Sequence, residues 1–279
     1  MKKKDELDFL YIKPMKKQIP EPTKKSPTKK KKKKKKKNSK KAKIIGFIFL
    51  ALIFIGGIIA FLLSPLFNIK EIVVEKNISI ASEKIIALSQ IELEENTFKI
   101  NKKDVIANIK KNPYVNSVKV KRKLPNTVIL QIEERQTSFQ IEFGTGYVYI
   151  NNQGYILEIS ETKLNVPTIK GITGNLEEGN RLNEQDLKKL EDVLKIMKEL
   201  NATEIGSIVT SIDITKENDY TLILEDEDKI VRLGDTSLLD LKISYTVLFL
   251  EREKGVKGEI IVNVDYNKNK PPYFRENVD

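Results

Sequence analysis

Two short stretches of the sequence carry residue types that could do chemistry. Ser160 and Lys163 have the S-x-x-K spacing, in which a lysine activates a serine nucleophile, as in penicillin-binding proteins. The companion S-x-N and K-T-G motifs are absent from the chain. A lysine-rich sequence also matches S-x-x-K by chance, and Ser26 to Lys29 is a second match. We therefore expect no catalysis at Ser160.

The second stretch is the acidic run "EDED" at residues 225–228, whose carboxylates could hold a hard cation. It lacks the spaced D-x-[DN]-x-[DN]-G pattern of a calcium loop, so a solvated turn is the simpler interpretation. The chain contains no histidine and no cysteine. This excludes zinc–thiolate sites and disulfides, and it removes the commonest general base at neutral pH. We expect no metal, cofactor or small-molecule substrate, and a protein that is not an enzyme.

Positive charge is concentrated at the N-terminus. Residues 1–43 hold 20 lysines and four acidic residues, so the formal charge of this tail is +16. Because the whole chain has a net charge of +11, the remaining residues sum to −5. The tail has no hydrophobic periodicity and contains four prolines, which predicts disorder. The mildly acidic remainder argues against nucleic-acid binding by the folded part, although the lysine run alone could contact nucleic acid.

Residues 44–63 form an uncharged apolar run long enough to span a bilayer. A cleaved signal peptide is the alternative, but its apolar core is usually about 7–15 residues long. Lys40, Lys41 and Lys43 precede the run, and the first charge beyond it is Lys70. The positive-inside rule then predicts a single-pass type II protein with a cytoplasmic N-terminus. The three lysines would lie at an anionic membrane surface.

Beyond the membrane the pattern predicts an α+β fold. A strand at 69–75, helices at 82–90 and 101–112, and strands at 115–122 and 127–134 make a β-α-α-β-β unit, with Ser82 and Asn101 as candidate N-caps. A β-rich region with two helices, 183–200 and 238–252, follows from residue 136. Its last predicted strand, 259–266, is followed by proline-broken sequence. That strand is either a free edge, open to strand addition by a partner, or central in its sheet.

The stretch "NPYVNSVKVKRKLPNTVILQIEER" at 112–135 resembles the end of the POTRA domain in FtsQ/DivIB cell-division proteins. The matching positions are Pro113, Tyr114, Val115, Arg122, Pro125, Glu134 and Arg135. "FNIKEIVVEKN", "NVPTIKG", "VRLGD" and "IIVNVDY" follow the same family in order. Leu124 and the Gln136-Thr137 pair depart from its pattern. Arg122 and Lys123 are expected on a solvated face or on a partner surface.

The resemblance implies a divisome scaffold at the septum that binds FtsL- and FtsB/DivIC-type partners by strand addition to the last strand. The implied partner-binding residues are Ile260, Val262, Val264, Tyr266, Tyr273 and Phe274. The implied segments are a disordered basic tail (1–43), a transmembrane helix (44–64), a POTRA domain (67–135), a β domain (136–266) and a flexible tail (267–279). A membrane-anchored wall-processing enzyme is the alternative function.

Overall fold

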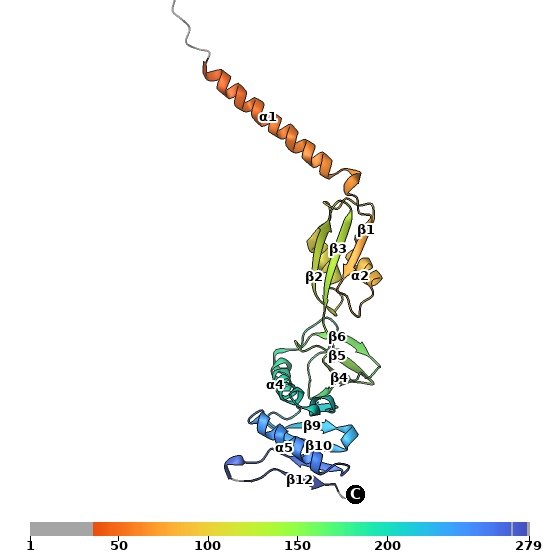
Figure 1. Cartoon of the computed structure of the whole chain (residues 1–279), viewed down its shortest axis with the longest axis vertical. Helices are drawn as coiled ribbons and strands as arrows, with labels where there is room; N and C mark the ends of the chain where they lie inside the picture. The colour runs from red at the N-terminus through yellow and green to blue at the C-terminus, as the bar shows by residue number, and fades with distance from the viewer. Residues whose placement is uncertain (1–35, 269, 278–279) are drawn as a thin grey trace, which may run out of the picture. The chain divides into compact units, whose positions relative to one another are not determined.

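The computed structural model describes residues 36–268 and 270–277. The chain divides into two compact units after Ile58, and each is described by itself. Helix α1 runs from Lys36 to Leu62 (Figure 1). Within the described residues, Lys40–Leu62 forms the one helix that is long and apolar enough to cross a membrane, with 23 residues and a mean hydropathy of 2.9. The helix begins earlier than expected, since 36–43 were assigned to the disordered tail. Residues 1–35 of that tail lie outside the described part of the chain.

The first domain after α1 has the expected β-α-α-β-β order. A short 3₁₀ turn, η1 (Pro65–Phe67), precedes it. Its elements are β1 (Glu71–Glu75), α2 (Ser82–Ser89), α3 (Lys102–Ile109), β2 (Val115–Lys123) and β3 (Thr127–Glu134). The strands form a sheet in the order β1-β3-β2, with β1 parallel and β2 antiparallel to β3. Alternate β3 residues face the two helices, so Val128, Leu130 and Ile132 are buried in one core with Ile85 and Ile109.

The two predicted helix caps have different outcomes. Asn101 caps α3 as predicted, because its side chain accepts the backbone N–H of Lys103 at 3.1 Å. The prediction for Ser82 is wrong: Ala81 is the N-cap of α2, and the Ser82 hydroxyl accepts a hydrogen bond from the Asn77 amide instead. Serine is a common cap, but its position relative to the first helical turn is decided by the loop before it.

The second domain is built on a nine-stranded sheet with two α-helices. Its strands are β4 (Phe139–Phe143), β5 (Gly146–Ile150), β6 (Ile156–Ser160), β7 (Thr168–Lys170), β8 (Ser211–Asp213), β9 (Tyr220–Leu224), β10 (Lys229–Gly234), β11 (Gly258–Ile261) and β12 (Tyr273–Glu276). The helices are α4 (Glu184–Asn201) and α5 (Leu239–Arg252), with short 3₁₀ turns η2 (Glu204–Ser207), η3 (Glu225–Glu227) and η4 (Tyr266–Lys268). The strand order is β12-β11-β10-β9-β8-β7-β4-β5-β6.

One face of this sheet is buried against both helices. Ile212, Leu222, Val231 and Ile260 pair in register across β8, β9, β10 and β11, and all four lie in the core with residues of α4 and α5. The helix residues in that core include Leu190, Val193 and Ile196 of α4 and Ile243 of α5. The neighbouring row, which includes Ile230 and Glu259, points to the opposite face. The C-terminal half of the sheet therefore buries one face and directs the other away from the helices.

The C-terminal segment differs from the expectation of a flexible tail. Residues 273–276 form β12, which pairs antiparallel with β11. The predicted strand 259–266 is also shorter: β11 ends at Ile261, and residues 266–268 form the 3₁₀ turn η4. The chain leaves the sheet at Val262 and returns to it eleven residues later, at Tyr273.

Candidate partner-binding edge

The strand expected to be a free edge lies inside the sheet. β11 pairs with β10 on one side and with β12 on the other. Ile260 and Val262 are fully buried, and the backbone N–H of Val262 donates to Arg232 at 3.1 Å. The expectation of an unpaired terminal strand at 259–266 is therefore wrong. The physical reason is that β12, four residues long, completes the sheet beyond it.

The edge of the sheet is β12 itself, next to the end of the chain (Figure 1). In an antiparallel pair, successive residues point their backbone groups alternately toward and away from the neighbouring strand. The N–H of Asn277 donates to Lys257 at 3.1 Å, so Asn277, Arg275 and Tyr273 point their backbone groups toward β11. The N–H and C=O groups of Phe274 and Glu276 consequently face outward.

The expected partner-binding residues are divided by this arrangement. Tyr273 is 49% exposed on the edge strand, while Phe274 is partly buried and packs against the core. Val264 and Tyr266 are half-buried in the segment that joins β11 to β12, where Tyr266 stacks on Tyr245 and donates its hydroxyl to the backbone oxygen of Val262. The structure thus places Tyr273 and Phe274 at the edge and leaves Ile260 and Val262 in the interior.

An ion cluster that the sequence did not reveal joins the last three strands. Glu259 on β11 accepts hydrogen bonds from Arg232 on β10 and from Arg275 on β12. The Glu259 side chain is 9% exposed, whereas those of Arg232 and Arg275 are 42% and 60% exposed. The cluster fixes the register of β12, because Arg275 lies directly opposite Glu259. The sequence shows each of these charged residues next to apolar strand residues, but it does not show that the three strands are neighbours.

The other edge of the sheet is occupied by the chain's own residues. The backbone N–H of Ile156, on β6, donates to Asn180 at 2.9 Å, and that of Ile159 donates to the carboxylate of Glu178 at 2.9 Å. Gly179 in turn donates its N–H to the backbone oxygen of Ile156. The two edges of the large sheet therefore differ, since among the described residues the β6 edge is covered and the β12 edge has no further strand beside it.

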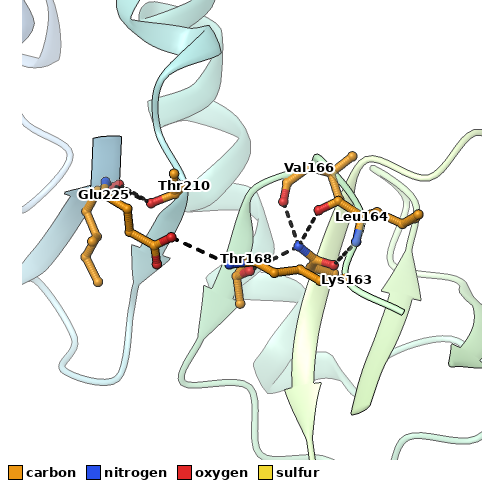
Figure 2. Close-up of polar contacts among 8 residues, drawn as sticks. Lys163, Leu164, Val166, Thr168, Thr210 and Glu225 are labelled. Atoms are coloured by element: carbon orange, nitrogen blue, oxygen red, sulfur yellow. Dashed lines mark hydrogen bonds and ion pairs between the residues drawn. The ribbon is translucent and has the colours of Figure 1, made fainter. Parts of the chain in front are cut away.

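Ser160 and Lys163 of the S-x-x-K match each have another partner in the structure. The Ser160 hydroxyl accepts the Thr162 backbone N–H, and the Lys163 ammonium lies 3.6 Å from Glu225 across a cleft of about 580 Å³ (Figure 2). The fully buried Gln140 holds the loop that follows Lys163. Its side chain donates to the Leu164 and Val166 carbonyls and accepts the Leu164 N–H, each at 2.9 Å.

The acidic turn is exposed and faces lysines. Glu225, Glu227 and Asp228 lie 3.5–4.0 Å from the ammonium groups of Lys163, Lys229 and Lys257. The pairs of Lys163 with Glu225 and of Lys257 with Asp228 are exposed, and such pairs contribute at most about 1 kcal/mol each. The Lys229 side chain is fully buried and also donates to the Glu227 carbonyl. Across the described ranges, 36–268 and 270–277, no cluster of three or more acidic residues is arranged to hold a metal ion.

The family-like stretch at 112–135 has structural roles within the first domain and in contacts with residues of the second. Glu134 accepts the backbone N–H groups of three successive residues, 78–80. Arg135 donates to the carbonyls of Pro113 and Val115, and its guanidinium lies 4.0 Å from the centre of the Tyr155 ring. The hydroxyl of Tyr114 donates to Glu158 at 2.7 Å. The pKa of Tyr114 is raised, mainly because the hydroxyl is buried and secondly because it is bonded to this carboxylate.

Arg122 is also structural. It donates to the carbonyls of Thr97 and Ile100 and lies over the ring of Phe98, so it holds the loop before α3. Arg122 is half-buried and bonded within the domain, which differs from the solvated face that was one expectation; a role in a partner surface stays a prediction. Lys123 is exposed. Lys40, Lys41 and Lys43 are exposed on the N-terminal turns of α1.

Comparison with known proteins identifies the family. Residues 67–135 match the protein family described as "POTRA domain, FtsQ-type". Cell division protein DivIB of Clostridium tetani is 31% identical over 74% of this chain and 78% of its own length. DivIB of Clostridium botulinum is 31% identical over 76% and 83%. Cell division protein FtsQ of Syntrophotalea carbinolica is 30% identical over 52% and 51%. The chain therefore belongs to the DivIB/FtsQ family of cell-division proteins and has a scaffold role in cell division.

Proposed function

We propose that this division scaffold works by contact, through strand addition at the outer edge of β12. The proposal rests on the backbone N–H and C=O groups of Phe274 and Glu276. They point away from β11, on a strand that is paired on one side only within the described sheet. Main-chain hydrogen bonds to an added strand supply affinity, and the neighbouring side chains supply selectivity. The partners are division proteins of the FtsL and FtsB/DivIC type. We propose no catalytic step.

The β2 edge of the small POTRA sheet is less suitable for strand addition than the β12 edge. β2, which lies at one side of it, carries Lys119, Lys121 and Lys123 at alternate positions. Charged side chains on an edge strand discourage pairing with another chain. At β12, by contrast, Tyr273 and Phe274 provide aromatic surface next to the free backbone groups. This difference favours the β12 edge as the docking site.

The proposed topology is type II, with the N-terminus in the cytoplasm and the domains from residue 64 onward outside, at the division septum. It is supported by exposed Lys40, Lys41 and Lys43 at one end of the apolar helix and by the absence of charge from Ile44 to Ile69. The same lysines are proposed to contact anionic lipid, at roughly 1 kcal/mol each. Protease accessibility in intact cells tests the orientation, since digestion of residues 64–279 only after the cytoplasm is opened would contradict it.

The docking edge is tested with Glu276→Pro. Proline removes the outward N–H and leaves the inward bonds of Arg275 and Asn277 in place. We expect it to weaken co-purification of the FtsL- and DivIC-type partners at least about tenfold, because one main-chain hydrogen bond is lost and the ring obstructs the added strand. Glu276→Ala keeps the N–H and removes only the carboxylate, so the difference between the two variants isolates the loss of the main-chain donor and the obstruction by the ring. A folded proline variant that retains the partners at wild-type levels would refute the site. Val262 is unsuitable for this test because its N–H is used inside the sheet.

A further inference from the structure

The β12 edge carries an excess of positive charge on one face of the sheet. Two arginines, Arg232 and Arg275, share the single carboxylate of Glu259. Arg275 is the outermost of the three, and 60% of its side chain is exposed. A guanidinium has five N–H donors in a fixed fork, so one carboxylate oxygen leaves most of them free. The edge therefore presents donors for a second carboxylate, on the face that points away from the helices.

The strand register decides where an incoming side chain would lie. Tyr273 and Arg275 point to the face away from the helices, and Phe274 and Glu276 point to the face that the helices cover. Side chains of directly opposed residues on neighbouring strands lie about 5 Å apart, and opposite charges there are favourable. A strand added to β12 would therefore place one residue against each of these four, on alternating faces.

The same register disfavours pairing between two copies of β12. An antiparallel pair that joins Phe274 of one copy to Glu276 of the other uses all the outward backbone groups, but it sets Arg275 directly against Arg275. Pairing Glu276 with Glu276 sets two carboxylates together. Like charges directly opposed on neighbouring strands are destabilising. The favoured occupant is therefore a different chain with its own charge pattern.

We infer, on the basis of the proposed docking edge, that β12 selects an extended partner segment with four consecutive residue types. These are a basic residue opposite Glu276, an acidic residue opposite Arg275, and two apolar residues opposite Phe274 and Tyr273. The acidic residue binds the free donors of Arg275, and the apolar pair covers the exposed ring of Tyr273 and the edge of Phe274. Arg275 is thus a specificity-determining residue of the docking edge.

The test uses the full chain in nanodiscs and two synthetic ten-residue peptides. One has the central order Lys-Asp-Val-Tyr within a serine and threonine background, and the other has the order Asp-Lys-Val-Tyr. Binding is measured by fluorescence anisotropy, and by hydrogen exchange of the segment 272–277, in which the two outward amides become protected. We expect the first peptide to bind about tenfold more tightly, since two cross-strand charge pairs are exchanged for two repulsive ones.

Charge reversal separates selection from folding. The double variant Arg275→Glu, Glu276→Lys reverses both charges of the edge and should invert the preference between the two peptides, a result that loss of structure would not produce. Arg232→Gln, which changes the charge two strands from the edge, should leave the preference in place. Equal binding of both peptides to the native chain, or an unchanged preference in the double variant, would overturn the inference. If Glu276→Pro still abolished binding in that case, the docking edge would stand and only its charge selection would fail.

Discussion

Replacing Glu134 by alanine should open the loop that leads into α2. The Glu134 carboxylate accepts the N–H groups of Ile78, Ser79 and Ile80 at 2.8, 2.8 and 3.1 Å. A hydrogen bond to a charged group contributes about 1.5–3 kcal/mol when buried. Ile78 and Ser79 are exposed, so water replaces most of what they lose, while Ile80 is 7% exposed. We therefore expect a loss of about 2 kcal/mol in local stability.

The assay is amide hydrogen exchange of residues 76–81 in the native chain. A loss of about 2 kcal/mol corresponds to roughly 30-fold faster exchange, because each tenfold change is about 1.4 kcal/mol. Glu133→Ala is the matched control: it removes the same charge one position away, and the Glu133 carboxylate accepts the Ser117 hydroxyl instead. If the two variants exchanged equally in this segment, Glu134 would not be what holds the loop.

Two further predictions concern the second domain. The pKa of Asp235 is lowered to about 2 by hydrogen bonds from Lys242 and then Ser237, so its contribution to stability is complete above pH 4 and is lost as the pH falls toward 2. Denaturant unfolding at pH 5, 3 and 2 should show this loss in the native chain and a flatter profile in Asp235→Asn; parallel profiles would contradict it. Gly171 has φ +102°, and a Cβ there would lie 2.5 Å from the backbone nitrogen of Thr215, so Gly171→Ala should cost about 3 kcal/mol by denaturant unfolding. Gly255→Ala, at φ +76° in open space, should cost only about 1 kcal/mol, and equal losses would show that backbone conformation alone decides.

The motif that identified the family was correctly located, but its roles were not readable from the sequence. Alternation in 127–134 and the helix signals at Asn101 predicted the β-α-α-β-β order, which the structure confirms. The same residues gave no sign that Glu134 binds the amides of a loop 54 to 56 positions earlier in the chain. Arg122 likewise binds carbonyls more than 20 positions away. Contacts at such separations depend on how the strands pair, and a local pattern does not encode them.

By itself the sequence determined the apolar span, the asymmetry of lysines around it, the α+β class and most of the helices and strands. These features follow from composition and from periodicity over a few residues, which short-range physics controls. The tertiary structure alone decided which strand is the edge. Residues 273–276 follow two prolines and are too few to signal a strand, and they become one because β11 offers its free side and Glu259 binds Arg275. The edge, its outward amides and its charge all arise from pairing between segments that are far apart in the chain or joined by an irregular loop.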